Sequence, residues 1–411
     1  MKRSTQTRIL TSHTGALPRP RDLVDMLAAR DERRPFDADA LQARVNEAVR
    51  DVVQHQADIG LTVINDGEHS KFSFWSYLKD RLTGLEMVDG AGSLFGGTTI
   101  FGGTSGAREA LDFPNYFARR PALDRFARAA EGPPRRLCCT GPLEWRDFDA
   151  TLADIESLKV AARDVPHADL FMTASSPGNL FQKVPNHYYP SDDEYLQAIA
   201  DVLRREYRAI VEAGIVLQLD APDLASRSGG DPANFSLQQF RIDIARAIEA
   251  LNYATADLPS DMMRVHVCWG SDERPHNRDN ELRDIVDILL TAHPAGLTLV
   301  AANGRHEFEW QVWRDVKLPE GKVLMAGVID STTNIIEHPE TVAERILRFA
   351  SVVGAENLIA GVDCGFQTSA GRDQVDPDIA WAKLASLAEG ARRASERLGR
   401  VSIDRLRSTR R

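Results

Sequence analysis

The chain has 411 residues, enough for two or three average domains but also within the range of one enlarged α/β barrel. Its 50 basic and 60 acidic side chains give a formal net charge of −10, which argues against nonspecific binding to nucleic acid. The chain is 43% hydrophobic and has no apolar run of the length that a membrane-spanning helix needs, so we expect a sizeable core and no membrane insertion.

Short apolar and β-branched runs alternate along the chain with longer stretches of helical spacing, an order typical of βα units. The predicted strands are residues 8–12, 61–66, 136–140, 170–175, 215–220, 264–269, 297–302, 323–330 and 357–364. The predicted helices are residues 37–59, 192–213, 237–252, 280–292 and 339–353. These strands exceed the eight of a (β/α)8 barrel by one, so either one is accessory or one is over-assigned. The assignment is weakest around residues 136–175.

The polar residues that follow the predicted strands favour a barrel over an open sheet. In a barrel all carboxyl ends of the strands converge on one face, where active sites lie, whereas an open sheet gathers its ligands at one switch point. Turn and cap preferences explain many Asp, Ser, Asn and Gly residues at these ends, but not the His, Cys and Trp residues. We therefore predict an α/β fold, a single (β/α)8 TIM barrel over residues 1–411 with insertions at its C-terminal face.

Two segments stand apart from the alternating pattern. Residues 73–135 are predicted to be an insertion, and its Gly-rich part, residues 86–110, is expected to form a hairpin or lid over the barrel mouth. The glycines lack the spacing of a phosphate-binding loop. The Arg-rich tail, residues 390–411, is expected to be a solvated helix.

The cysteine count and the N-terminal residues bear on the compartment. Four cysteines are too few for a disulfide framework, and residues 1–7 are polar with no apolar signal segment after them. Both features predict a cytoplasmic protein with reduced thiols. Cys138 and Cys139 are neighbours on a predicted strand, so they face opposite sides and are assigned to packing.

A candidate metal site combines two strand ends. His266 and Cys268 are two residues apart on a predicted strand, so their side chains face the same side and can bind one ion, although both residue types are also common in cores. Cys364 follows the last predicted strand, and barrel geometry can bring it to the same place. Zn²⁺ suits such a Cys₂His set, and three protein ligands leave one position open for substrate.

Carboxylates also end several predicted strands. At a barrel mouth such groups can bind an ammonium group, act as acid or base, or support a metal ligand, while helix capping is the alternative, most plausible for Asp223 and Asp330. We assign candidate catalytic roles to three of them: Glu68, Asp220 and Asp330. The candidate substrate-binding residues are His13, Asp66, Asp223, Trp269 and Asn303.

Seven segments, in this order, resemble the cobalamin-independent methionine synthase superfamily, and in particular its single-barrel members of the "methionine synthase II" type. They are residues 13–20 (HTGALPRP), 66–68 (DGE), 218–224 (QLDAPDL), 266–270 (HVCWG), 303–306 (NGRH), 327–330 (GVID) and 363–366 (DCGF). Each segment alone is unspecific, but their common order over nearly the whole chain makes the resemblance specific.

The resemblance implies a zinc-dependent transferase on a (β/α)8 barrel. His266, Cys268 and Cys364 match the family's zinc ligands, and the metal makes an incoming thiol a thiolate nucleophile. That thiolate attacks a methyl group on a folate nitrogen, or an epoxide carbon in the related coenzyme M transferases. Glu68 and Asp220 match the carboxylates that hold the amino group of homocysteine. The expected partners are a small-molecule thiol and a methyl or alkyl donor, and a homo-oligomer of the chain is an option that the sequence leaves open.

The chain departs from the family pattern at three positions. Val300 stands at the family's fourth zinc ligand, a glutamate, for which Glu307 or Glu309 is a distant substitute. Thr332 occupies the position where family members have a histidine that is proposed to donate a proton, and Ala16 occupies the position of a family serine. Without the glutamate, a bound metal ion is a stronger Lewis acid. Without the histidine, the site lacks an acid to protonate the folate leaving group. A zinc-dependent lyase or hydrolase, an epoxide:thiol transferase and a barrel without catalysis therefore remain alternatives.

Overall fold

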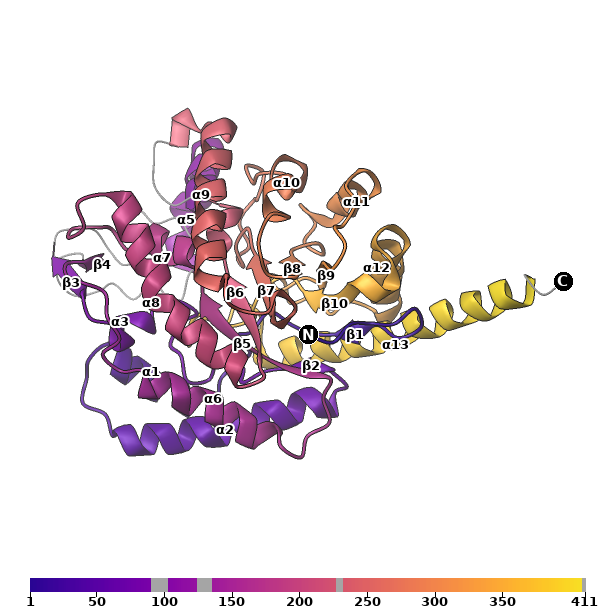
Figure 1. The fold of residues 1–411 in the computed structure, drawn as a ribbon, viewed down its shortest axis with the longest axis horizontal. Coiled ribbons are helices and arrows are strands. Elements are labelled where there is room, and N and C mark those ends of the chain that lie inside the picture. Colours follow the sequence, from indigo (N-terminus) through magenta and orange to yellow (C-terminus); the bar gives the residue numbers. More distant parts are fainter. Residues whose placement is uncertain (90–102, 124–134, 227–231, 409–411) are drawn as a thin grey trace.

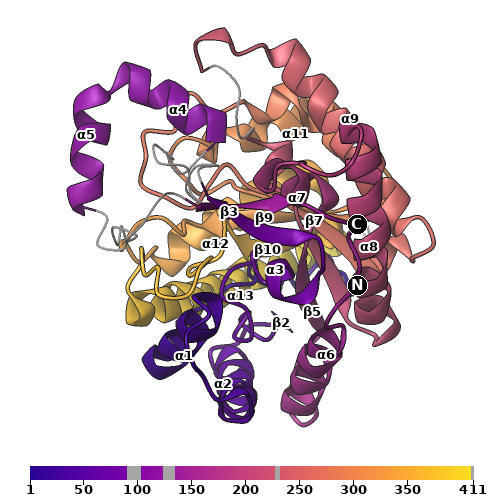
Figure 2. The same ribbon diagram turned by 90° about the vertical axis from the view of Figure 1, so that its left-hand side faces the viewer.

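A barrel of eight parallel strands forms the centre of the molecule (Figures 1 and 2). The computed structural model describes residues 1–89, 103–123, 135–226 and 232–408. The strands lie in the order β1-β10-β9-β8-β7-β6-β5-β2. Their bounds are β1 (Leu10–Thr11), β2 (Val63–Ile64), β5 (Asp169–Ser175), β6 (Val216–Asp220), β7 (Met263–Val267), β8 (Gly296–Leu299), β9 (Val323–Ile329) and β10 (Leu358–Val362).

Two threonines join the edge strands of this sheet. The backbone N–H of Thr11, in β1, donates to Oγ1 of Thr62 at 2.8 Å, and the N–H of Thr62, just before β2, donates to Oγ1 of Thr11 at 3.1 Å. Thr62 Oγ1 also donates to the carbonyl of Thr11 at 3.0 Å. Side chains thus satisfy the polar groups that an open edge would expose. The predicted (β/α)8 barrel is confirmed.

The ninth predicted strand lies outside the barrel. Residues 136–140 fall largely in β4 (Arg135–Cys139), which pairs with β3 (Leu85–Asp89) in a separate antiparallel sheet. The run at 170–175, by contrast, is the barrel strand β5. The surplus strand is therefore accessory, because its partner is a strand of the preceding segment and no barrel strand.

Helices follow the strands and cover the outside of the barrel (Figure 2). The longer ones are α1 (Arg21–Asp31), α2 (Ala38–Asp58), α6 (Asp149–Ala162), α8 (Asp192–Glu212), α9 (Leu237–Thr255), α12 (Pro339–Val353) and α13 (Pro377–Ser408). The shorter ones are α3 (Leu78–Arg81), α4 (Gly103–Asp112), α5 (Pro114–Leu123), α7 (Pro177–Lys183), α10 (Val286–Leu289) and α11 (Val312–Asp315). No helix among the described residues is long and apolar enough to cross a membrane.

The helix predicted over residues 280–292 is wrong for most of its length. The segment contains one 3₁₀ turn (Leu282–Asp284) and the single-turn helix α10. Contacts with other elements explain the difference, because the N–H of Leu282 is bound by Oε1 of Glu309 at 2.7 Å and the carbonyl of Asp284 accepts from Arg241. Tertiary hydrogen bonds here override the helical spacing.

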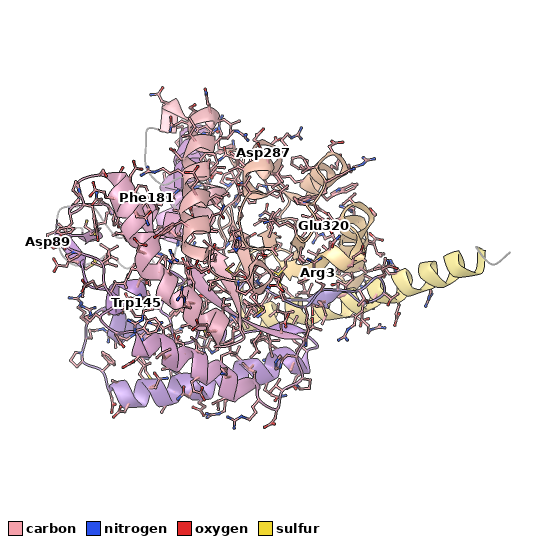
Figure 3. All side chains as sticks on the ribbon, viewed as in Figure 1. Arg3, Asp89, Trp145, Phe181, Asp287 and Glu320 are labelled. Carbon is pink, nitrogen blue, oxygen red and sulfur yellow. The ribbon has the colours of Figure 1, made fainter. Side chains whose placement is uncertain are left out.

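Side chains fill the barrel interior and the layer between strands and helices (Figure 3). One apolar layer inside the barrel consists of Leu10, Val63, Phe171, Val216, Val323, Met325 and Ile359. Next to this layer lies Arg264, whose guanidinium is 3.9 Å from the centre of the Phe171 ring. It donates to Gln218 Oε1 at 2.8 Å and to the carbonyl of His13 at 3.0 Å. The pattern of apolar runs did not predict this charged group inside the barrel.

The two segments predicted to stand apart are described in part. Residues 86–89 lie in β3 and residues 103–110 in α4, whereas the glycine-rich residues 90–102 lie outside the described part of the chain. Residues 390–408 of the tail belong to α13, which begins before residue 390, packs against α12 and extends away from the barrel (Figure 1), and residues 409–411 lie outside the described part of the chain.

Candidate metal centre

Three side chains from two strand ends meet at the carboxyl end of the barrel. His266 is the penultimate residue of β7, Cys268 directly follows β7, and Cys364 lies two residues after the end of β10. One ligand atom of each lies within 4.8 Å of the others, and all three residues are buried. The two sulfur atoms are 3.2 Å apart, too far for a disulfide, and all four cysteines of the chain are free. We call His266, Cys268 and Cys364 the sulfur cluster.

The hydrogen bonds of the sulfur cluster leave its imidazole unused. Neither ring nitrogen of His266 has a hydrogen-bond partner among the described residues, although both are buried. The Cys268 thiol donates to Cys364, and this hydrogen bond, together with the nearby His266, holds the pKa of Cys364 well below its usual value. The buried imidazole interacts with the Cys364 thiolate and has no nitrogen or oxygen partner among the described residues, and this donor set fits Zn²⁺.

Asp363, the residue directly before Cys364, helps to position that cysteine. Its carboxylate accepts the backbone N–H groups of Ala301, Ala302 and Asn303 at 2.8, 2.9 and 2.6 Å, so it joins the segment after β8 to the end of β10. A Cβ on Gly327 would lie 2.0 Å from Asp363 Oδ1, so only glycine fits beneath it. Burial raises the pKa of Asp363 to about 7. Sequence reasoning missed this role, although the residue lies in the DCGF segment.

A pair of buried carboxylates lies beside the sulfur cluster. Glu68 Oε1 accepts from Thr173 Oγ1 at 3.0 Å, while Oε2 has no partner among the side chains that the structure describes. Asp220, at the end of β6, accepts from Gln218 Nε2 at 2.8 Å. Burial, and then repulsion from Asp220, raises the pKa of Glu68; burial raises that of Asp220, against an opposing effect of His266. The structure thus brings both predicted carboxylates together with the metal-binding candidates.

The backbone around Glu68 is shaped for a close approach. Glu68 has a φ of 58°, which non-glycine residues rarely adopt, and a Cβ on Gly15 would lie 2.5 Å from its Oε1. Asp66 Oδ1 accepts the N–H of Glu68 at 3.0 Å, and Arg19 donates to the Glu68 carbonyl at 2.9 Å. Asp66 therefore builds the turn that presents Glu68, which is a supporting contact.

His13 is held by protein groups on both ring nitrogens. Its Nε2 is 2.8 Å from Gln56 Oε1, and its Nδ1 accepts the N–H of Gly15 at 3.2 Å. Burial lowers its pKa to about 3, so the ring is neutral. These contacts fix the loop that carries Gly15 against Glu68, and they use both nitrogens that a substrate would need.

The other candidates have contacts typical of turns and caps. Asp223 accepts from Ser176, the N-cap residue of α7, at 3.0 Å. Asp330 accepts four hydrogen bonds from the backbone and hydroxyl groups of Thr332 and Thr333 in its own loop. Neither residue caps a helix: Asp330 holds a turn in its own loop, and Asp223 Oδ2 has no hydrogen-bond partner among the described residues.

Trp269 and Asn303 lie in the segments that leave β7 and β8. The indole N–H of Trp269 donates to the carbonyl of Asn280 at 2.8 Å, and its ring packs 4.5 Å from the ring of His306. Asn303 Oδ1 accepts the N–H of Arg305 at 2.8 Å. Both residues shape loops next to the sulfur cluster.

The two glutamates considered as a fourth ligand have other partners. Glu309 binds His306 Nδ1 at 3.0 Å as well as the Leu282 N–H, and Glu307 pairs with Arg345 at 3.3 Å. Val300 is buried and apolar. The sulfur cluster therefore offers three protein ligands to a metal.

Comparison with known families places residues 189–382 in the family described as "Cobalamin-independent synthase, Catalytic domain". An uncharacterised protein of Bacillus subtilis, YxjH, is 25% identical over 390 residues, which cover 90% of this chain and 91% of the relative. A protein named methionine synthase from Saccharolobus islandicus, strain Y.G.57.14, is 24% identical over 400 residues, covering 96% of this chain and 98% of the relative.

Two solved structures share the fold. One is a B12-independent methionine synthase from a Shewanella species in complex with selenomethionine, with a TM-score of 0.66, 18% identity, and coverage of 95% of this chain and 99% of that one. The other is a putative B12-independent methionine synthase from Listeria monocytogenes, with a TM-score of 0.61, 19% identity, and coverage of 95% and 98%. At this identity the likeness concerns the barrel alone.

Proposed function

We propose that the chain belongs to the cobalamin-independent methionine synthase family, whose catalytic-domain model matches residues 189–382, and that it transfers a methyl or alkyl group to the sulfur of a small thiol. The observation that carries the proposal is the sulfur cluster with the Glu68 and Asp220 carboxylates beside it. The sulfur cluster is suited to a thiophilic metal ion, and the two carboxylates are suited to an ammonium group. A molecule with both a thiol and an amino group therefore fits both.

His266, Cys268 and Cys364 would hold the metal, which we propose is Zn²⁺. Their donor set has two sulfur atoms and one imidazole whose nitrogens are otherwise unused. When bound there, Zn²⁺ lowers the pKa of a coordinating thiol so that it is a nucleophilic thiolate at neutral pH. Val300 offers no ligand atom, which leaves the fourth position to substrate.

The two carboxylates would bind and orient the substrate. Glu68 Oε2 is a buried acceptor with no partner among the described side chains, and an ammonium group supplies both the charge and the hydrogen bond that it lacks. The relative solved with bound selenomethionine takes a molecule of this kind, with an amino group and a chalcogen. We infer that the acceptor thiol is homocysteine or a close analogue.

The proton of the thiol needs an acceptor before sulfur attacks. Asp220 interacts electrostatically with His266 and Cys364 and has a raised pKa, so its carboxylate is suited to take that proton. The sulfur–carbon bond then forms as the bond between the carbon and its leaving group breaks. Thr332 is no acid, so the leaving group departs most easily if it needs no protonation. This favours an activated methyl donor over methylfolate.

A thiol methylation assay tests the proposal. Purified enzyme is incubated with homocysteine and, in parallel, with 5-methyltetrahydrofolate, a methylsulfonium compound, methylcobalamin or an epoxide, and the S-alkylated product is quantified by mass spectrometry. We expect product with at least one donor, and none from the Cys364→Ser variant. Donor consumption that does not depend on the thiol would contradict the proposal and indicate a lyase or hydrolase.

Because all four thiols are free, we further propose a cytoplasmic location.

A further inference from the structure

A second cluster of possible metal ligands lies in the loops after β7 and β8. One ligand atom each from His276, Asp279 and His306 lies within 4.8 Å of the others, and all three residues are buried. We call them the imidazole–carboxylate cluster. It has no sulfur and supplies no residue to the proposed methyl transfer, yet it adjoins that site, because the ring of His306 packs against Trp269, the residue after Cys268.

A single oxygen atom lies between the two imidazoles. Asp279 Oδ2 is 2.6 Å from His276 Nδ1 and 3.2 Å from His306 Nε2. The outward nitrogen of each ring also meets an acceptor: His276 Nε2 is 2.9 Å from the carbonyl of Asp272, and His306 Nδ1 is 3.0 Å from Glu309 Oε2. All four ring nitrogens therefore face a carbonyl or carboxylate oxygen atom.

The cluster can hold either two protonated imidazoles or two neutral imidazoles and a divalent cation. A neutral imidazole has one N–H, so four nitrogens facing four acceptors require two imidazolium ions buried side by side. A divalent cation bound by His276 Nδ1, His306 Nε2 and Asp279 replaces the two inner protons and leaves the net charge unchanged. Each ring would then donate its remaining N–H to Asp272 or Glu309, the outer contact that metal-bound histidines usually make.

The surroundings carry an excess of negative charge that suits a cation. Arg274 is the basic group that pairs with Asp279, at 3.4 Å, and it also pairs with Asp272 at 2.9 Å and with Glu109 of α4 at 3.3 Å. The carboxylates of Asp272, Asp279, Glu109 and Glu309 thus surround one guanidinium and two imidazoles, an arrangement that favours a bound cation.

Backbone strain points to the same residue. His276 has a φ of 55°, in the left-handed region that favours glycine. Strain of this kind persists where surrounding interactions determine the conformation, and it is common at ligand sites. Here it directs the His276 ring toward Asp279.

We propose that His276, Asp279 and His306 bind a second divalent transition-metal ion, for which Zn²⁺ is the best match to two imidazoles and a carboxylate. The ion joins the loop after β7 to the loop after β8, and Arg274 links the loop after β7 to Glu109 of α4. Its role is to fix the loops that surround the sulfur cluster, and it stands independently of the methyl transfer proposed above.

Metal analysis of the intact protein tests the proposal. Protein produced with added zinc is dialysed and analysed by elemental mass spectrometry. We expect about two zinc ions per chain in the wild type, about one in His306→Ala, Asp279→Asn or Cys364→Ser, and close to none in the double variant His306→Ala/Cys364→Ser. His293→Gln is the matched control, since His293 is half-buried and bound to the Leu258 carbonyl outside both clusters. One zinc in the wild type that His306→Ala retains would overturn the proposal.

Cobalt titration of the wild type avoids any effect of the variants on folding. We expect two binding phases in metal-free protein, of which only one produces the intense near-ultraviolet band of cobalt–thiolate bonds. The second phase should show only the weak visible bands of nitrogen and oxygen ligands. A single phase that saturates at one equivalent, with nitrogen NMR showing two imidazolium rings afterwards, would assign the cluster to protons instead.

Discussion

The two clusters at the barrel mouth each offer three buried ligands, but their imidazole nitrogens differ in what they contact. In the sulfur cluster the ring nitrogens of His266 have no hydrogen-bond partner among the described residues. In the imidazole–carboxylate cluster both nitrogens of His276 and of His306 face an oxygen atom. Each cluster offers three protein ligands, so the number of ligands does not separate them, and the difference lies in the contacts of the imidazole nitrogens.

The carboxylates of the two clusters differ in their charge partners. Each cluster has a buried carboxylate oxygen without a hydrogen-bond partner among the described residues, Glu68 Oε2 beside the sulfur cluster and Asp279 Oδ1 in the other. Asp279 Oδ1 lies 3.4 Å from the Arg274 guanidinium, which balances part of its charge. For Glu68 Oε2 the partner in the proposed function is the ammonium group of the substrate. We therefore propose chemistry for the sulfur cluster and loop support for the other.

Removing a sulfur ligand should have the largest effect. Cys364→Ser replaces a soft thiolate with a hydroxyl that binds zinc poorly, and we expect kcat/KM for thiol methylation to fall by roughly a thousandfold or more. Cys138→Ala is the control, because Cys138 is a buried cysteine in β4, outside the barrel. An equal loss of kcat/KM in both variants would mean that the effect of Cys364→Ser is a general effect on folding and not the loss of a metal ligand.

The Glu68→Gln variant tests the open carboxylate. The amide keeps the shape but removes the charge that an ammonium group needs, so we expect KM for homocysteine to rise by about 100-fold with a smaller change in kcat. The amino group can be removed instead, since a thiol of the same length without it should bind both enzymes about equally weakly. A KM for homocysteine that does not change in the variant excludes ammonium binding by Glu68.

The pH dependence of stability should distinguish the two states of the imidazole–carboxylate cluster. Without metal, the pKa of His306 is about 9 in the folded protein and ordinarily 6.5, so its contribution is fully present below pH 6.5 and is lost as the pH rises through 9. Between pH 6.5 and 8 this loss is about 1.5 kcal/mol. Urea unfolding should show it in chelator-treated protein and not in zinc-loaded protein, because a metal ion binds better as protons leave. His306→Ala should abolish the difference.

The Asp363→Asn variant should have the smallest of these effects. The amide loses the charge that binds three N–H groups, and its NH₂ group cannot accept from them. The loop that carries Cys364 then shifts, and we expect about a tenfold loss of zinc affinity at the sulfur cluster. Competition with a chromophoric chelator measures this affinity. An unchanged affinity would mean that β10 alone positions Cys364.

The sequence predicted the sulfur cluster because the convergence of strand ends in a barrel does not depend on individual side-chain contacts. Carboxyl ends of parallel strands converge, so His266, Cys268 and Cys364 could be brought together from strand positions alone. The same reasoning placed Glu68 and Asp220 at the mouth. It did not separate these carboxylates from Asp223 and Asp330, because the choice between capping a turn and facing a ligand depends on individual hydrogen bonds.

The imidazole–carboxylate cluster was not predictable in the same way. His276, Asp279 and His306 lie in two loops with little regular structure, so no period places them together. Helical spacing over residues 280–292 also suggested a helix where Glu309 and Arg241 hold the backbone in another conformation. Arg264 escaped notice for a related reason, since a run of apolar residues does not show which polar member points into the barrel.

X-ray absorption at the zinc edge, recorded before and after homocysteine is added, tests the central claim most directly. Zinc-loaded protein should show about two sulfur ligands per chain, from Cys268 and Cys364, and about three once the thiol is present. The gain should be absent in Cys364→Ser and should persist in His306→Ala. A spectrum without sulfur, or one that homocysteine leaves unchanged, would contradict the assignment of the sulfur cluster as the site where the thiol is activated.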